Sequence, residues 1–189
     1  MVVALAISVA PGKFEFMPDN SVKSVTKAGF QWQSYLLLWY AIAVIVLVID
    51  QLTKTWIVSE FYLGQREVIS SFFNLVSVRN YGAAFSFLSD AGGWQRWFFT
   101  ILSSVISVII FVWIGRLGKS NALESLALAL ILGGALGNLY DRVMLGYVVD
   151  FLDFHWSGTH FPAFNVADAG ISMGAMLLIL DMFISPKDS

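Results

Sequence analysis

Two carboxylates, Asp150 and Asp168, have sequence neighbours that point to chemistry. Asp150 interrupts an apolar Val-Val-Asp-Phe run, and Asp168 lies near the start of a long apolar stretch. Two carboxyl groups held close together cannot both ionise easily, so such a pair shares one proton near neutral pH. One carboxylate can then take a proton from water while the other protonates a carbonyl oxygen, as in aspartic proteases. If the chain is a protease, these are its candidate catalytic residues.

Each acid also has a purely structural explanation. Asn165 and Asp168 have the spacing of a helix capping box, and an acid in the first turn of a helix suits the helix dipole. Asp150 and Asp153 can be read as a pair of exposed loop acids. Neither motif is strong by itself. The chemical interpretation gains its weight from the expectation, developed below, that both acids lie on one face of a membrane.

Other polar residues are spaced by one helical turn. Asp50 and Lys54 are four residues apart and can pair on one helix face, although a helix end whose lysine reaches the membrane interface explains them as well. Asn138 and Arg142 have the same spacing and flank Asp141. We expect them to form either a structural ion pair or a substrate clamp, and the sequence favours neither.

Glycines accompany two of these polar clusters. Asn80-Tyr81-Gly82 has the composition of a tight turn, and the small residues from Gly82 onward permit close approach of the backbone. Gly133 and Gly137 form a GxxxG pair, which packs helices closely and is therefore expected to be structural.

Several kinds of chemistry are excluded by composition. The chain has no cysteine, which excludes a disulfide, a thiolate zinc site and a cysteine nucleophile. Its only histidines, His155 and His160, fall in a segment expected to be an exposed aromatic loop, and there is no HExxH motif. We therefore expect no metal and no cofactor. The net charge of -2 offers no basic surface for nucleic acid.

The elements that must position these residues are membrane helices. The chain is 58% hydrophobic and 13% charged, with a mean hydropathy of +0.74, whereas soluble domains are about 25% charged. Four stretches are long and apolar enough to cross a bilayer, at about 35–58, 97–114, 122–140 and 163–184. If the helices alternate in direction, the polar ends of the first, third and fourth share one side of the membrane.

The predicted fold is an all-α polytopic membrane protein with four transmembrane helices and a small extracytoplasmic β-element. The β-element is expected within 59–95, where Val, Phe and Ser partly alternate. Residues 1–30 are expected to be an N-terminal tail, disordered or produced by an upstream start site, since Met17 begins a plausible alternative start. Residues 31–186 are expected to form one membrane-embedded domain.

Basic residues favour cytoplasmic termini and a polar cluster on the outer face. When Lys54 and Arg142, which lie inside polar clusters, are set aside, six basic residues fall on the side of the termini and three on the polar side. They are Lys13, Lys23, Lys27, Arg116, Lys119 and Lys187 against Arg66, Arg79 and Arg96.

Five segments together resemble, in order, the sequence blocks of lipoprotein signal peptidase (signal peptidase II), a family of bacterial membrane aspartic peptidases. They are Asp50-Gln-Leu-Thr-Lys54, Asn80-Tyr-Gly-Ala-Ala-Phe85, Gly134-Ala-Leu-Gly-Asn138-Leu-Tyr-Asp141-Arg142, Val148-Val-Asp150-Phe151 and Phe164-Asn165-Val-Ala-Asp168. The resemblance covers about residues 35–184. It implies four transmembrane helices, an extracytoplasmic β-cradle and an adjoining loop that closes over the substrate.

The resemblance also implies roles for the residues. Asp150 and Asp168 would be catalytic. The remaining candidates would bind substrate or support the site, and they are Asp50, Lys54, Asn80, Gly82, Asn138, Asp141, Arg142 and Asn165. The implied substrate is a prolipoprotein that carries diacylglycerol on its cysteine, cut just before that cysteine in the bacterial inner membrane. Membrane lipid and cyclic peptide inhibitors of the globomycin type would be further partners, and we expect a monomer.

Two other functions compete with this interpretation. A small proton- or ion-coupled transporter could use Asp50, Asp150 and Asp168 as a relay, although the chain lacks the inverted repeats and proline-broken helices typical of such proteins. A non-catalytic membrane scaffold would leave the clustering of acids on one face without an explanation.

Overall fold

The computed structural model describes residues 22–82, 94–117, 119 and 121–184. It contains four long helices and four strands. In chain order they are α1 (Val22–Glu60), β1 (Arg66–Ser70), β2 (Phe73–Asn80), α2 (Trp94–Arg116), α3 (Ala122–Met144), β3 (Val148–Trp156), β4 (Thr159–His160) and α4 (Val166–Ile184). The first 21 residues of the expected tail, with the start-site question at Met17, lie outside the described residues, as do residues 83–93 within the second sequence block and the segment that follows it.

All four expected membrane spans are present. The candidate spans are Tyr35–Glu60, Trp94–Arg116, Ala122–Met144 and Val166–Ile184. Two boundaries differ from expectation in a way that affects the site. α3 continues to Met144, so Asn138 and Arg142 lie within its last turns, and α4 begins at Val166, so Asn165 directly precedes it. α1 begins at Val22, so residues 22–30, which were expected in the tail, are helical.

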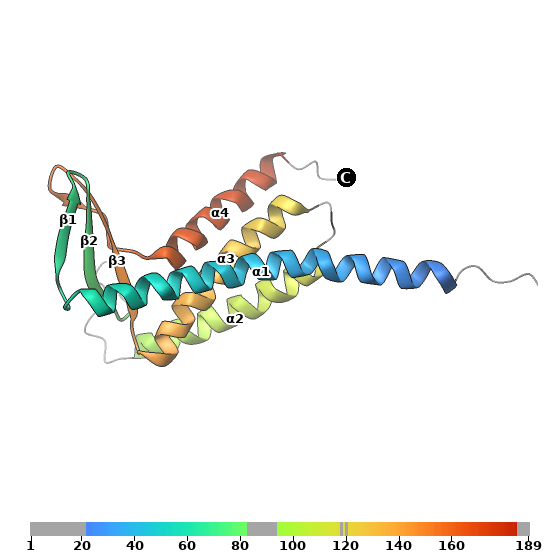
Figure 1. The fold of residues 1–189 in the computed structure, drawn as a ribbon, viewed down its shortest axis with the longest axis horizontal. Helices are drawn as coiled ribbons and strands as arrows, with labels where there is room; N and C mark the ends of the chain where they lie inside the picture. The colour runs from blue at the N-terminus through green and yellow to red at the C-terminus, as the bar shows by residue number, and fades with distance from the viewer. Residues whose placement is uncertain (1–21, 83–93, 118, 120, 185–189) are drawn as a thin grey trace, which may run out of the picture.

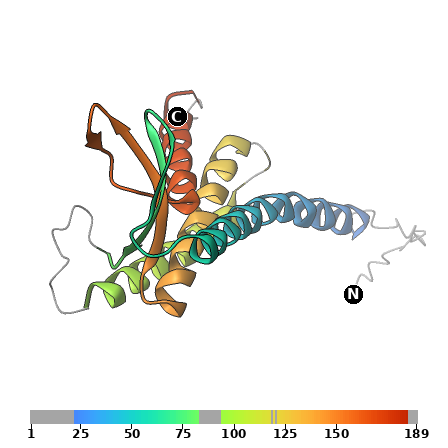
Figure 2. The ribbon, with the colours of Figure 1, turned by 60° about the vertical axis from the view of Figure 1, so that its left-hand side comes forward.

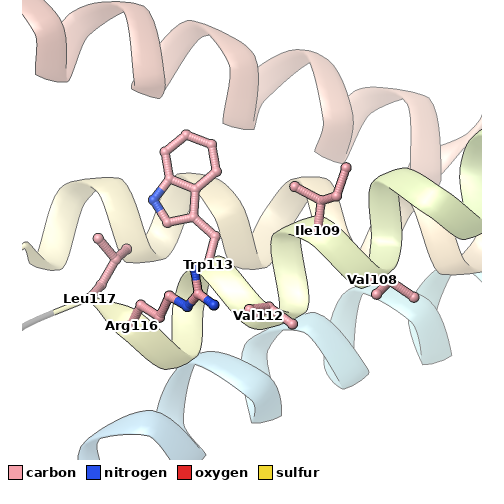
Figure 3. A pocket seen from close by; sticks show the side chains of 6 residues that line it. All are labelled: Val108, Ile109, Val112, Trp113, Arg116 and Leu117. Atoms are coloured by element: carbon pink, nitrogen blue, oxygen red, sulfur yellow. The ribbon is translucent and has the colours of Figure 1, made fainter.

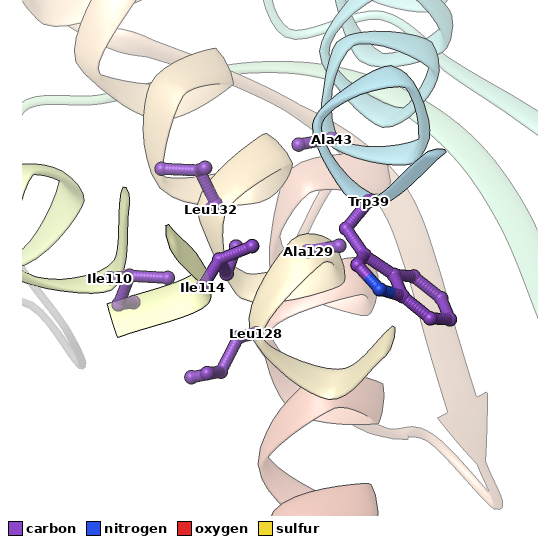
Figure 4. Packing of buried hydrophobic residues seen from close by; sticks show 7 residues of the cluster. All are labelled: Trp39, Ala43, Ile110, Ile114, Leu128, Ala129 and Leu132. Atoms are coloured by element: carbon purple, nitrogen blue, oxygen red, sulfur yellow. The ribbon is translucent and has the colours of Figure 1, made fainter. Parts of the chain in front are cut away.

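α3 is the central helix of the bundle (Figure 1). Of its most apolar window, 56% is buried, against 11–17% for the other three spans. Its many alanines and glycines explain this position, since small side chains let three neighbouring helices approach closely. Around it packs a core cluster, shown in Figure 4, that consists of Trp39, Ala43, Ile110, Ile114, Leu128, Ala129 and Leu132.

The outward faces of the other helices are apolar, as lipid requires. Leu37 on α1, Ile101 on α2 and Phe183 on α4 are all more than half exposed. Near the end of α2 that is remote from the sheet, a hollow of about 660 Å³ opens on this surface and is lined by Trp113, Arg116 and four apolar residues (Figure 3). This hollow is therefore part of the membrane-facing surface and is separate from the polar cluster.

The strands form one antiparallel sheet in the order β1-β2-β3-β4. It lies across one end of the bundle (Figures 1 and 2). The expected β-element in 59–95 supplies only β1 and β2. The alternative of an exposed loop pair for Asp150 and Asp153 and the expected loop around His155 and His160 were wrong, because all four residues lie on β3 and β4. β3 pairs with β2 from Asn80↔Val148 to Phe73↔Phe154, a partnership between distant segments that local sequence does not reveal.

Candidate active site

The structure brings Asp150 and Asp168 together at the junction of the sheet and the bundle. Asp150 comes from β3 and Asp168 from the first turn of α4. Two amide side chains join them. Asn165 Nδ2 donates to Asp150 Oδ1 at 2.7 Å, and Asn138 Nδ2 donates to Asp168 Oδ1 at 2.7 Å. Asn165 Nδ2 also reaches Asn138 Oδ1 at 3.3 Å. The two carboxylates therefore belong to one continuous polar network.

The start of α4 is capped as the sequence suggested. The backbone N–H of Asp168 donates to Asn165 Oδ1 at 2.9 Å, and the backbone N–H of Asn165 donates to Asp168 Oδ2 at 3.3 Å. This reciprocal pair is the capping-box arrangement. Only one carboxylate oxygen is used in it, because Oδ1 of Asp168 faces Asn138. The structural and chemical interpretations of Asp168 are thus compatible.

The turn after β2 places the side-chain amide of Asn80 against Asp150, in addition to that of Asn165. Asn80 Oδ1 accepts the backbone N–H of Gly82 at 2.9 Å, which leaves Asn80 Nδ2 to donate to Asp150 Oδ2 at 2.9 Å. Gly82 has φ +103°, in the region that favours glycine. A side chain there would also meet the ring of Phe99, since a Cβ would lie 2.7 Å from its Cδ2. Gly82 is therefore required for the turn that directs the side chain of Asn80 toward Asp150.

Burial and a neighbouring acid tune Asp150, which is 2% exposed. Burial, and after it the charge of Asp168, raise the pKa of Asp150, and the amide hydrogen bonds and the charge of Lys54 oppose the rise, so that the pKa lies at about 7. Asp150 therefore changes protonation state near neutral pH, which is where a general acid works best.

Asp50, Lys54 and Asp141 form a buried ionic cluster beside the pair. Lys54 Nζ lies 2.8 Å from Asp50 Oδ2 and 3.0 Å from Asp141 Oδ2. Lys54 is 2% exposed, so the alternative in which it reaches toward the membrane interface is wrong. Lys54 also donates to Asn138 Oδ1 at 3.0 Å, which connects the cluster to the network of the aspartates.

Arg142 approaches the pair from α3 without binding it directly. Its Nη1 donates to the backbone carbonyl of Asn138 at 3.2 Å, and its guanidinium lies 5.4 Å from the ring centre of Phe99. Its charge acts on Asp168 and Asp150, yet it forms no ion pair within the described parts of the chain. Its remaining N–H donors can therefore serve a third group, such as a substrate carbonyl.

Two further residues, Gln51 and Arg96, support the site and were not predicted from the sequence. Gln51 Nε2 donates to Asp141 Oδ1 at 2.9 Å, Gly137 O at 3.2 Å and Asp50 Oδ2 at 3.2 Å. Arg96 on α2 donates to the carbonyls of Arg142 at 2.9 Å and Val143 at 3.0 Å, near the end of α3. A polar side chain within a span was the available signal for Gln51.

Asp153 belongs to a separate cluster and is not an exposed loop acid. It is 4% exposed, accepts from Asn74 Nδ2 at 2.8 Å, and lies 2.8 Å from His160 Nδ1. Burial alone would raise the pKa of Asp153, but the bonds from Asn74 and His160 and the charges of His160 and Arg66 outweigh it and lower the pKa. Among the described residues, no group of three or more His, Asp or Glu could hold a metal ion.

Comparisons with known proteins identify the family of the chain. Residues 42–184 match the family model described as signal peptidase (SPase) II. The lipoprotein signal peptidase of Shewanella halifaxensis is 52% identical over 157 residues, which cover 83% of this chain and 92% of that protein. The lipoprotein signal peptidase of Shewanella baltica is 53% identical over 156 residues, covering 82% and 91%.

Solved structures give the same result for the fold. Two structures of bacterial membrane enzymes determined by the in meso method align with TM-scores of 0.70 and 0.69, at 35% and 36% identity. The alignments cover 80% and 79% of this chain and 93% and 94% of those chains. Residues 42–184 contain most of the first span, the other three spans and the sheet, and on these grounds the chain belongs to the signal peptidase II family of aspartic-type peptidases.

Proposed function

We propose that this protein cleaves diacylglyceryl-modified prolipoproteins just before the lipid-modified cysteine, with Asp150 and Asp168 as the catalytic pair. The observation that carries the proposal is the pair itself. Its two carboxylates come from β3 and α4 and are joined by hydrogen bonds through Asn165 and Asn138. Asp50, Asp150 and Asp168 lie in one local cluster and do not form a relay along the bundle. The family is one of peptidases, so the transporter alternative has no support.

The chemistry follows from a shared proton. Asp168 in its ionised form takes a proton from water, and the resulting hydroxide attacks the carbonyl carbon of the scissile peptide bond. Asp150 gives its proton to the carbonyl oxygen. When the tetrahedral intermediate collapses, the C–N bond breaks, the amine nitrogen takes the proton held by Asp168, and the hydroxyl proton returns to Asp150. The pair ends with one proton, as it began.

The neighbouring residues have distinct roles in this scheme. Arg142 binds a substrate carbonyl through its remaining donors and orients the peptide. Asn138 and Asn165 keep amide donors on the carboxylates, and Asn80, with the turn at Gly82, does the same for Asp150. Asp50, Lys54 and Asp141 form the buried ionic cluster beside the pair and hold its surroundings in place.

The site lies where a lipid-linked peptide can reach it. The four spans present apolar faces to lipid, and the carboxylates lie at the end of the bundle beneath the sheet. We propose that acyl chains enter from the bilayer between the spans while the peptide lies along the sheet. We place the protein in the bacterial inner membrane with cytoplasmic termini and the site near the outer face, as the distribution of basic residues favours. A monomer suffices for this arrangement, and cyclic peptides of the globomycin type would compete for the same site.

A cleavage assay tests the proposed substrate. The purified protein is incubated with a prolipoprotein peptide that carries diacylglycerol, and with the same peptide without lipid, and the products are identified by mass spectrometry. We expect one cut, directly before the cysteine, in the lipid-modified peptide only. Cleavage at another bond, or equal cleavage of both peptides, would contradict the proposal.

A further inference from the structure

Two buried acids hold the backbone directly before each proposed catalytic aspartate. Asp50 Oδ1 accepts the backbone N–H of Ala167 at 2.8 Å, and Asp141 Oδ2 accepts the backbone N–H of Val149 at 3.2 Å. Ala167 precedes Asp168 on α4, and Val149 precedes Asp150 on β3. The separation between Asp50 and Asp141 therefore contributes to the separation of the catalytic pair.

Lys54 forms an ion pair with each of these two acids. Its Nζ lies between the two acids, at 2.8 Å from Asp50 and 3.0 Å from Asp141. Asp50 is 0% and Asp141 1% exposed, so solvent screens their repulsion poorly. Among the described residues, Lys54 is the only cation that forms an ion pair with either acid. Gln51 also bridges them, but it is neutral.

Lys54 also sets the direction of a hydrogen bond to the pair. An ammonium group has donors only, so the oxygen of the Asn138 amide must face Lys54, at 3.0 Å. The nitrogen of that amide is thereby directed to Asp168 Oδ1, at 2.7 Å. Without the ammonium group the Asn138 oxygen keeps only the longer bond from Asn165 Nδ2, at 3.3 Å, and the orientation of the amide is held less firmly.

We propose that Lys54 is the positioning residue of the catalytic pair, because one ammonium group fixes Asp50, Asp141 and the Asn138 amide, and through them the placement of both aspartates. This inference rests on the proposed function. Lys54 itself needs no contact with the substrate. Loss of the ammonium group should therefore lower kcat by about 100-fold or more, since misplacement of the reacting groups by about 1 Å can cost that much. KM should change much less.

The pH dependence gives a second readout that a purely structural role would not move. The charged groups that face Asp150 are Asp168 from α4, Lys54 from α1 and Arg142 from α3, and the other facing groups are the neutral amides of Asn80 and Asn165. The charge of Lys54 opposes the raised pKa of Asp150. Removing it should raise that pKa further and move the alkaline limb of kcat to higher pH.

The experiment compares three variants in detergent with a lipid-modified peptide substrate. Lys54→Met removes the ammonium. Lys54→Met combined with Asp141→Asn leaves the cluster with one formal negative charge, as in the wild type, and guards against simple unfolding. Lys54→Arg restores a cation and should recover part of kcat. Lys119→Met is the matched control, because Lys119 is exposed and lies beyond the other end of α2.

The outcomes separate this inference from the proposed function. We expect both variants that lack a cation to lose about 100-fold in kcat at a temperature where they remain folded, and Lys119→Met to match the wild type. A folded double variant with wild-type kcat and pH profile overturns the role of Lys54, as does a loss confined to thermal stability. If Asp150→Asn and Asp168→Asn are themselves active, the proposed function fails instead.

Discussion

At the scale of single residues, the direction of the amides is what distinguishes this site from an ordinary cap or turn. Asn80, Asn138 and Asn165 each have their oxygen committed to another donor, and each presents its nitrogen to a carboxylate. The orientation of each amide is thus fixed by a second donor, which is the Gly82 backbone N–H for Asn80, Lys54 for Asn138 and the Asp168 backbone N–H for Asn165. The five polar blocks were recognisable in the sequence, but the direction of these bonds depends on partners from α1, β3, α4 and the turn after β2.

The raised pKa of Asp150 predicts a stability that depends on pH. Its folded-state pKa is about 7 and its ordinary value 3.8, so between these values the folded protein binds more protons than the unfolded chain. Stability should therefore fall as pH rises from about 4 to 7 and then level off. The Asp150→Asn variant has no ionisable group at this position and should not lose stability in this way. The difference between its melting temperature and that of the wild type should therefore grow by about 5 °C or more between about pH 4 and pH 7.

Thermal unfolding in detergent at several pH values measures this difference. A constant offset between the two curves is acceptable, because asparagine changes the hydrogen bonds of the site at every pH. Asp153→Asn is the matched control on the same strand, where the pKa is lowered instead. Curves of wild type and Asp150→Asn that run parallel from pH 4 to 8 would show that Asp150 is not perturbed as described.

At the scale of elements, the helices follow from the sequence and half of the sheet does not. Each span is continuous and apolar enough to be read locally, and the GxxxG pair does pack closely, with Gly133 against Ala43 and Val46 and Gly137 against Asp50. β3 was not predicted as a strand, and its apolar run is interrupted by Asp150 and Asp153, which are satisfied by residues distant in sequence. Strand pairing with β2 and the partners Asn74 and Asn80 exist only in the folded chain.

The contact between α3 and α4 next to Asp168 predicts the effect of a glycine substitution. A Cβ on Gly134 would collide with the backbone carbonyl of Ala167 and lie 2.9 Å from Ile171 Cγ1. Because backbone cannot move aside easily, Gly134→Ala should displace the start of α4. We expect a destabilisation of about 1–3 kcal/mol from overpacking and a fall in kcat of about 10-fold or more from the shift of Asp168.

The matched control is Gly115→Ala on α2. A Cβ there meets only the hydroxyl group of Tyr40, at 3.2 Å, and alanine is favoured over glycine within a helix by about 1 kcal/mol. Its stability and kcat should equal or exceed those of the wild type. Chemical or thermal unfolding together with kcat measures both variants. If Gly134→Ala behaves like the control, α3 and α4 are not locked together beside Asp168.

At the scale of the whole molecule, the bundle and the sheet together create a position that neither supplies alone. α4 contributes Asp168, β3 contributes Asp150, and α1 contributes Lys54 and Asp50 behind them. Composition and hydropathy were sufficient to predict a membrane protein with a polar cluster at one end. They could not predict that Asp153, three residues from Asp150, belongs to a different network, because that division depends on the pairing of β3 with β2 and β4.

The most direct test of the catalytic pair is kcat for Asp150→Asn and Asp168→Asn on a diacylglyceryl-modified prolipoprotein peptide, with Asp153→Asn measured beside them. Each of the first two changes removes the proton chemistry of one carboxylate with little change in shape, so each should lower kcat by about 1,000-fold or more while the protein stays folded. Asp153→Asn should retain kcat within about threefold, since Asp153 makes no contact with the pair. Substantial turnover by either Asp150→Asn or Asp168→Asn would contradict the assignment.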